Sequence, residues 1–205
     1  MNIIGLTHAV TDIMPTYPGD SVPSLRQIAS IEKDGYMNYV FSTGVHVGTH
    51  IDAPAHMIEC GKRIDELSLE SFRGQGVCVD AREKKEMDIE MLRNRDIKKD
   101  NIVLFCTGFS KKYREESYFI DFPVMDEALA MELMKRKVKM VGFDTPSPDK
   151  PPFLIHKILL GAGILIIENL TNLESLLSHK HFDVQAFPLN IVADAAPARI
   201  MAVTK

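Results

Sequence analysis

The sequence predicts a single α/β domain that is rich in strands and spans residues 1–205. At 205 residues the chain has the length of one domain and is long enough to bury a sizeable core. Short apolar runs such as Ile102–Cys106 and Ile164–Ile167 have the length of buried strands. Residues Met125–Lys137 show the apolar periodicity of an amphipathic helix. We find no internal repeat, linker or low-complexity tract that would divide the chain.

The first hundred residues are expected to contain short strands and one charged helix. The strands are expected at Ile3–Leu6, Ile28–Ile31, Tyr39–Ser42 and Val77–Val79. A turn-rich loop surrounds Tyr17, and residues 64–69 remain ambiguous. Residues 81–100 carry seven Lys or Arg against six Asp or Glu. Because these charges cancel, the segment is interpreted as a solvated helix and not as a basic binding patch.

In the second half, strands and helices alternate. The helix at Met125–Lys137 has acidic residues at its start and basic residues at its end, as the helix dipole favours. A short helix is expected to open at Pro151-Pro152, to carry His156 and to close at Gly161. A small helix is expected around Leu173–Leu177, and residues 178–181 are interpreted as a solvated loop. The strands of this half are expected at Ile102–Cys106, Val138–Phe143, Ile164–Ile167, Phe187–Val192 and Arg199–Val203.

Composition and charge narrow the class of protein. The net charge of −4 does not indicate a nucleic-acid-binding surface. The longest apolar stretch, Leu159–Ile167, is about half of what a membrane span requires. The three cysteines form no CxxC pair, and the N-terminus lacks the features of a signal peptide. The sequence therefore predicts a cytoplasmic protein that acts on a small molecule, without a nucleic-acid or membrane partner.

The residues from His46 to His56 are the main candidate for a functional site. Side chains alternate along an extended chain, so four polar residues would project to the same side: His46, His50, Asp52 and His56. On a helix Asp52 would point away from His46. Gly48 and Pro54 favour a strand that bends into a loop. Converging imidazole and carboxylate groups suit a divalent metal. The alternative is that the histidines are ordinary polar residues and that Asp52 only forms a turn.

A second set of candidates lies further along the chain. Glu168 directly follows the strand expected at Ile164–Ile167, and His156 precedes it on the short helix. A buried strand that ends in a carboxylate, close in sequence to a histidine, is a natural source of further metal ligands. Alternatively, His156 is a helix-surface residue and Glu168 is an acid at a helix N-terminus.

Together these residues form a recognisable pattern. HxGTHxDxPxH, followed about a hundred residues later by His-x11-Glu, resembles the cyclase family of metal-dependent hydrolases. That family includes bacterial kynurenine formamidase, isatin hydrolase and some polyketide cyclases. Further landmarks of the family are similar to segments along nearly the whole chain: Tyr17–Asp20, Cys106–Gly108, Gly142–Ser147, Glu168–Leu170, Pro188-Leu189 and Ala196–Arg199.

The resemblance implies a fold, an assembly and a set of roles. The fold would be the family's swivelling β/β/α arrangement, usually as a homodimer or a larger homo-oligomer. His46, His50 and Asp52 would bind one metal, while Asp52 and Glu168 would bridge to a second metal held by His156. One or two ions per subunit are expected, with zinc as the first expectation and manganese as the alternative. His56 would be the catalytic acid/base.

The implied chemistry is that of an amide hydrolase. A metal lowers the pKa of bound water and polarises a carbonyl. A neighbouring imidazole titrates in the range that moves protons near neutral pH. The leading expectation is an arylformamidase-like enzyme that converts N-formylkynurenine to kynurenine. A ring-opening hydrolase or lactonase with a non-indole substrate, and a non-catalytic metal-binding protein, are the alternatives.

The substrate pocket departs from that of the kynurenine formamidases. Those enzymes typically place a Trp near the Pro-Gly-Asp loop, and this chain contains no Trp. Tyr17, Phe109 and Tyr113 are the aromatic residues available to contact a substrate. Each of them could equally be an ordinary packing residue.

Overall fold

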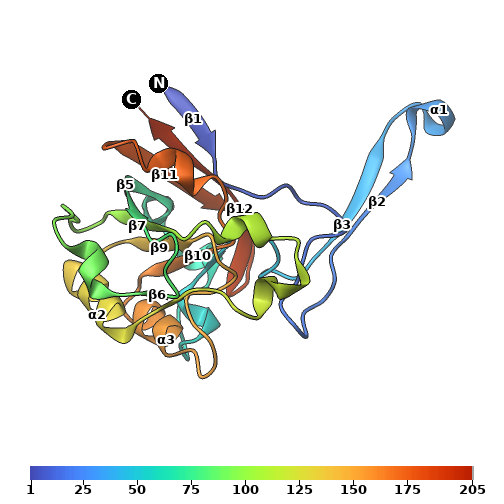
Figure 1. Ribbon diagram of the computed structural model, residues 1–205. Helices are drawn as coiled ribbons and strands as arrows, with labels where there is room; N and C mark the ends of the chain where they lie inside the picture. The colour runs from blue at the N-terminus through green and yellow to red at the C-terminus, as the bar shows by residue number, and fades with distance from the viewer. Residues whose placement is uncertain (205) are drawn as a thin grey trace.

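A computed structural model describes residues 1–204, and its centre is an eight-stranded mixed sheet (Figure 1). Because β12 pairs with both β11 and β4, the seven strands from β12 to β4 close into a barrel-like ring, and β1 extends it at one edge. In sheet order the strands are β1 (Asn2–Gly5), β12 (Ala195–Thr204), β11 (Phe182–Pro188), β5 (Arg73–Asp80), β7 (Ile102–Cys106), β9 (Met140–Phe143), β10 (Leu165–Glu168) and β4 (His50–Asp52).

The middle of the sheet is parallel and fully covered. β5, β7, β9 and β10 run parallel to one another, which explains their nearly continuous apolar sequences. Helices α2 (Glu127–Arg136) and α3 (Leu154–Gly161) pack on one face through Leu129, Leu133 and Leu159, each with no exposed surface. Asp126 caps α2 by accepting a hydrogen bond from the Leu129 amide. The helix predicted at 125–137 is thus confirmed.

Short 3₁₀ helices and one small parallel pair complete the body. Strands β6 (Glu86–Met87) and β8 (Val124–Met125) form the pair. The 3₁₀ helices are η1 (Pro54–His56), η2 (Ile64–Glu66), η3 (Leu69–Phe72), η4 (Ile89–Leu92), η5 (Phe109–Lys112), η6 (Glu116–Phe119) and η7 (Leu173–Leu176). Among residues 1–204 there is no helix with the length and apolar content needed to cross a membrane.

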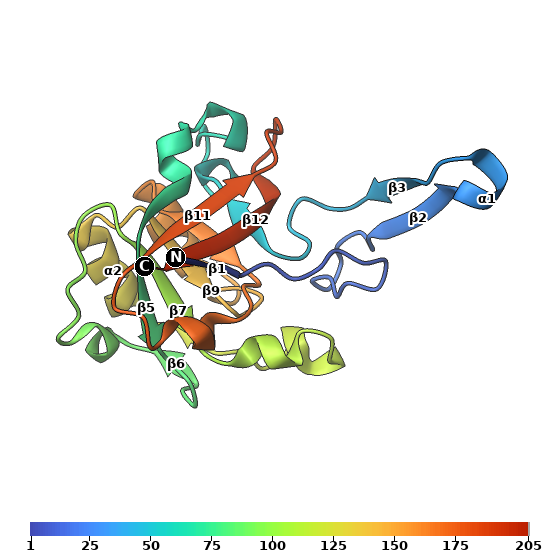
Figure 2. The ribbon, with the colours of Figure 1, turned by 90° about the horizontal axis from the view of Figure 1, so that it is seen from above.

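Two strands leave the body as an arm. β2 (Ser24–Ala29) and β3 (Asn38–Ser42) form an antiparallel ribbon whose tip carries the one-turn helix α1 (Ile31–Asp34). Figures 1 and 2 show this ribbon extending away from the barrel in both views. The strand predicted at Ile28–Ile31 is wrong at its end, because the Ser30 hydroxyl accepts a hydrogen bond from the Lys33 amide and starts α1.

Two other expectations are corrected. Residues 81–100 do not form a solvated helix, because Met87 and Leu92 are buried at a spacing that does not suit one helix face and anchor β6 and η4 instead. The strand predicted at Phe187–Val192 ends at Pro188, which lacks the amide hydrogen that a strand ladder needs. Residues 189–194 form an exposed connection to β12.

Candidate metal centre and catalytic site

The centre of the site lies where β4 runs between β10 and β12. The antiparallel register of β4 and β10 places His50 directly opposite Glu168. His50 Nε2 lies 3.3 Å from Glu168 Oε2 and 3.3 Å from Asp52 Oδ1. The three side chains are almost completely buried. Strand pairing therefore brings together two carboxylates and an imidazole that are far apart in sequence.

His46 and His56 reach this centre from either side of β4. His50 and Asp52 share one side of strand β4, and the chain leaves the strand at Gly48 and at Pro54, as the predicted bend into a loop requires. His46 lies in a turn, and His56 is the last residue of η1. The convergence is nevertheless achieved, since His46 Nδ1 lies 3.0 Å from Asp52 Oδ1 and the His46 and His56 ring centroids are 4.2 Å apart.

The turn before β4 requires a glycine. Gly48 has a φ of +73°, in the left-handed region that other residues rarely adopt. Its carbonyl accepts a hydrogen bond from His50 Nδ1 at 2.8 Å and another from Asn169 Nδ2 at 3.1 Å. Thr49 donates its hydroxyl to the Asn169 carbonyl at 2.5 Å. These bonds fix the turn against the end of β10.

His156 enters from α3 and faces the same carboxylates. Its Nε2 lies 3.3 Å from Glu168 Oε1 and 3.8 Å from Asp52 Oδ2. Its Nδ1 is bonded to Asp149 Oδ1 at 2.5 Å, and Asp149 Oδ2 accepts the Ile155 amide at 2.6 Å. Asp149 thus holds both the first turn of α3 and the imidazole.

The buried polar atoms at the centre fit a divalent metal. His50 Nε2 and both carboxylate oxygens of Asp52 are buried and make no hydrogen bond within residues 1–204. Leaving such atoms unsatisfied is costly, whereas a cation would satisfy them. Ligand atoms of His50, Asp52 and Glu168 lie within 4.8 Å of one another, and so do those of His46, Asp52 and His56. Imidazole nitrogen and carboxylate oxygen are donors that zinc and manganese accept.

The charges of these groups are strongly coupled. Burial opposes ionisation of Asp52, but His50 and His46 outweigh it and hold the Asp52 pKa well below its usual value. Burial likewise opposes protonation of His50, yet Asp52 and Glu168 raise its pKa well above the usual value. Against the same effect of burial, Asp149 and Glu168 raise the pKa of His156 to about 10. The carboxylates thus attract positive charge, which a bound metal would supply in place of protons.

Asp194 is a site residue that sequence reasoning missed. Its Oδ2 lies 3.0 Å from His46 Nε2 and 3.0 Å from His56 Nδ1. Burial would raise the Asp194 pKa, but hydrogen bonds from His46 and His56 lower it. Its backbone carbonyl accepts the Ala53 amide at 2.9 Å, which ties it to the end of β4. The residue lies 138 positions from His56, and no local pattern marks it.

A cavity of about 200 Å³ opens above the centre. His46, His56, His156 and Glu168 form part of its lining. The apolar walls are formed by Pro15, Tyr17, Met57, Phe119, Pro146 and Phe153, and further polar groups come from Asp20, Ser147 and Asn169. An apolar cavity of about 150 Å³ is able to hold a benzene ring. The site therefore has room for a ring-containing substrate beside the ionisable groups.

Of the three predicted substrate-contacting aromatics, only Tyr17 lines the cavity. Phe109 and Tyr113 are buried and do not line this cavity, which argues against the expectation that they contact substrate. Tyr113 stacks on His8 with ring centroids 3.7 Å apart, and Phe109 stacks on Tyr118 at 5.4 Å. Phe109 and Tyr113, with Tyr118 and Phe122, form a small hydrophobic core within residues 109–122.

Comparisons with known proteins identify the family and the fold. A family model described as putative cyclase matches residues 4–150. The kynurenine formamidase of Geobacillus thermodenitrificans is 30% identical over 202 residues, covering 96% of this chain and 94% of the relative. Isatin hydrolase A from Ralstonia solanacearum has a TM-score of 0.90 at 23% identity, covering 100% of this chain and 92% of its own. A potential metal-dependent hydrolase with cyclase activity has a TM-score of 0.84 at 27% identity, covering 100% and 98%.

Proposed function

This chain belongs to the cyclase family, and on that premise we propose that it is a metal-dependent hydrolase of amide bonds. The observation that carries the proposal is the set of buried, unsatisfied atoms of His50 and Asp52 beside a partly exposed imidazole, His56. The kynurenine formamidase relative supports an aryl formamide, with N-formylkynurenine as the leading candidate. The ring-sized cavity with apolar walls supports the same substrate class.

In each imidazole, the nitrogen that donates a hydrogen bond to the protein determines which nitrogen remains to bind a metal. A carboxylate or a carbonyl only accepts, so the nitrogen that faces it carries the proton. His50 Nδ1 donates to the Gly48 carbonyl and His156 Nδ1 donates to Asp149, which leaves the Nε2 atoms to bind a metal. His46 Nε2 donates to Asp194, which leaves Nδ1 beside Asp52. These three histidines, with Asp52 and Glu168, would hold one or two ions; we propose zinc first and manganese second.

The metal, when bound, supplies Lewis-acid polarisation and lowers the pKa of water. The protein supplies the proton transfer. His56 Nδ1 donates to the ionised Asp194, so His56 Nε2 is free to accept a proton and to pass it to the leaving nitrogen. His56 is also close enough to His46 and Asp52 to bind a metal itself, so its role needs a direct test.

A panel of substrates tests the proposal. The metal-supplemented protein is assayed against an aryl formamide, an aliphatic formamide, a cyclic aryl amide and an aryl lactone. We expect the aryl formamide to be hydrolysed fastest, and expect no turnover by the Asp52→Asn variant. If wild-type protein binds metal but hydrolyses none of the four, the chain is a non-catalytic metal-binding protein.

The second candidate is a ring-opening hydrolase. Its support is the fold shared with isatin hydrolase A and a cavity that accepts a ring. Faster hydrolysis of the cyclic amide or the lactone than of the aryl formamide would favour this candidate over the first.

A further inference from the structure

Asn169 follows Glu168 at the end of β10, and its backbone is bonded to two other segments of the site. Its amide donates to the Thr145 carbonyl at 3.0 Å, and its carbonyl accepts the Thr49 hydroxyl at 2.5 Å. Its φ of +55° lies in the left-handed region, which asparagine adopts more readily than most residues. Because only 4% of the residue is exposed, its side-chain amide must find its partners within the protein.

The side chain of Asn169 joins two groups that are far apart in sequence. Its Nδ2 donates to the Gly48 carbonyl at 3.1 Å, and its Oδ1 accepts the Tyr118 hydroxyl at 3.0 Å. The same Gly48 carbonyl accepts His50 Nδ1 at 2.8 Å. Since a carbonyl only accepts, the amide nitrogen of Asn169 must face Gly48 and its oxygen must face Tyr118. The hydrogen bonds therefore run in one direction, from Tyr118 through Asn169 to the carbonyl that also holds His50.

Tyr118 is fixed inside residues 109–122, which we call the aromatic lobe. It has no exposed surface, and its ring makes edge-to-face contacts with Tyr113 and Phe119 at centroid distances of 5.4 Å and 5.1 Å. Burial raises the pKa of the Tyr118 phenol well above its usual value, so the hydroxyl keeps its proton and donates. A ring that is packed on several sides gives Asn169 a rigid partner.

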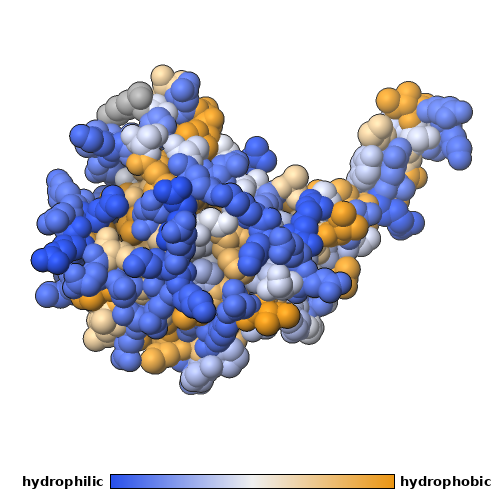
Figure 3. Space-filling model, viewed as in Figure 1, coloured by the Kyte–Doolittle hydropathy of each residue, from blue (hydrophilic) through white to orange (hydrophobic). Residues whose placement is uncertain are grey.

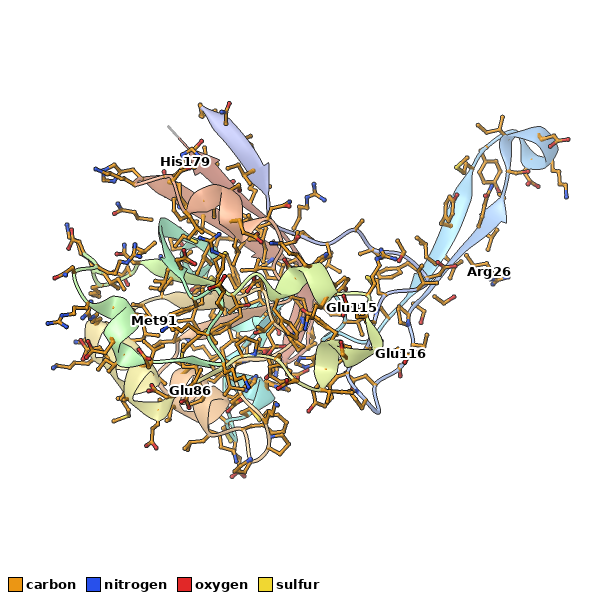
Figure 4. All side chains as sticks on the ribbon, viewed as in Figure 1. Arg26, Glu86, Met91, Glu115, Glu116 and His179 are labelled. Carbon is orange, nitrogen blue, oxygen red and sulfur yellow. The ribbon has the colours of Figure 1, made fainter. Side chains whose placement is uncertain are left out.

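The exterior of the aromatic lobe is polar. Figures 1 and 2 show the lobe in yellow-green, on the side of the barrel from which the arm leaves. Figure 3 shows mostly hydrophilic surface where the lobe lies, the region in which Figure 4 labels Glu115 and Glu116. The charged residues of the lobe are all exposed: Lys111, Lys112, Arg114, Glu115, Glu116 and Asp121. The buried hydroxyl of Tyr118 thus faces inward, where it meets the end of β10.

We propose that Tyr118 and Asn169 are positioning residues of the metal centre, which hold the Gly48 carbonyl, and through it the His50 imidazole, in the orientation that binds metal. Partners of this kind orient a metal-binding histidine and raise its basicity. Gly48 adopts a left-handed φ and is flexible by nature, so a second bond to its carbonyl restrains it where His50 needs it. The proposal rests on the metal-binding part of the proposed function and on no particular substrate.

Tyr113 provides a matched control for Tyr118. It lies in the same lobe and is 3% exposed, but its hydroxyl makes no hydrogen bond within residues 1–204. Tyr113→Phe and Tyr118→Phe therefore both remove a buried hydroxyl and keep the ring, and only Tyr118→Phe breaks a bond. If the Tyr118 hydroxyl serves only to attach the lobe, its loss should lower stability and leave metal affinity unchanged.

Zinc affinity of the full-length protein, measured by competition with a chromophoric chelator, tests the proposal. Asn169→Gly removes the side-chain bonds and keeps the backbone, because glycine adopts a positive φ without strain. We expect Asn169→Gly to weaken zinc binding roughly 10- to 100-fold, as for other residues that orient a ligand. Tyr118→Phe should weaken it roughly 2- to 10-fold, the range of one hydrogen bond. Tyr113→Phe should bind zinc as tightly as wild type.

The double variant Tyr118→Phe with Asn169→Gly separates action through Asn169 from a general loss of stability. Once Asn169 is gone, removal of the Tyr118 hydroxyl should cause no further loss of zinc affinity, whereas independent effects would multiply. Multiplied losses, or equal losses in Tyr113→Phe and Tyr118→Phe, would overturn the proposal.

The wild-type protein distinguishes failure of this inference from failure of the proposed function. If wild type binds no zinc, the proposed function fails and this inference fails with it. If wild type binds zinc and Asn169→Gly binds it equally tightly, only the positioning role is wrong. Urea unfolding of each metal-free variant confirms that the compared proteins are folded.

Discussion

Each imidazole of the centre has one ring nitrogen that donates to an oxygen of the protein. Gly48, Asp149 and Asp194 provide those oxygens, and the other ring nitrogen of His50, His156 and His46 then faces Asp52 or Glu168. Such supports set the tautomer and the orientation of a metal-binding histidine. The motif from His46 to His56 could be found in the sequence because its donors lie close together. Asp149 and Asp194 could not, since they act only through contacts that the fold creates.

The role of His56 separates two interpretations of the motif. As an acid/base, His56→Ala should retain its metal and lose about 10²- to 10⁴-fold in turnover. Metal analysis and kcat are measured on the same preparation. Loss of metal in proportion to activity would identify His56 as a ligand.

Asp194→Asn keeps the size of the side chain and removes its charge. We expect kcat to fall roughly 10- to 100-fold, as for other residues that orient a catalytic or metal-binding imidazole. KM should change little, because Asp194 does not line the cavity. A rise in KM at unchanged kcat would argue against the positioning role.

Tyr17→Ala tests which aromatic contacts the substrate. KM for an aryl formamide should rise, while small aliphatic amides should be nearly unaffected, because the change removes ring contact and not chemistry. Phe109→Leu is the comparison: Phe109 is buried among other rings, so this change should lower stability and leave KM unchanged. Equal losses of Tyr17→Ala on both substrates would mean that Tyr17 supports the fold.

Among the elements, strands and helices with a strong apolar pattern were predictable. β7, β9, β10 and α2 have continuous apolar runs or a clear helical periodicity, and they lie where the sequence predicts. Residues 81–100 were mispredicted because charge dominates their sequence, while their structure is decided by a few buried anchors. The strand predicted at 187–192 was misplaced because its apolar residues are exposed on the surface. Apolar sequence alone does not tell a core strand from an exposed surface segment.

Helix α3 depends on Asp149 at its start. Asp149→Ala removes the acceptor of the Ile155 amide and of the His156 imidazole. Although the N-cap position of α3 is Phe153, Asp149 accepts an amide of the first turn as a capping side chain does. Loss of such a bond typically costs about 0.5–2 kcal/mol, and we expect a loss of that order in the free energy of unfolding. Urea unfolding checks this value, with Asp126→Ala, which removes the cap of α2, as the matched control. Only Asp149→Ala should also weaken metal binding, because only Asp149 holds the His156 imidazole. Equal metal affinity in the two variants would contradict this role of Asp149.

At the scale of the whole molecule, closure of the strand ring positions the site. Pairing of β12 with β4 closes the barrel and places Ala195, next to Asp194, opposite Asp52. The start of the last strand and a strand from the first half of the chain thus meet at the site. This closure was not predictable from the sequence without the family resemblance, because the pairing joins segments about 140 residues apart. The arm was predicted in part as strands, but its separation from the body is a property of the fold alone.

The central claim is that a metal bound by the β4 motif makes this chain a hydrolase. Protein stripped with a chelator is titrated with zinc, and in parallel with manganese, while bound metal and hydrolysis of an aryl formamide are both measured. We expect activity to rise in proportion to bound metal up to one or two ions per chain. His50→Ala, which removes a buried donor, should bind metal more than about 100-fold more weakly. Equal metal content in wild type and His50→Ala, or full activity in the stripped protein, would contradict the claim.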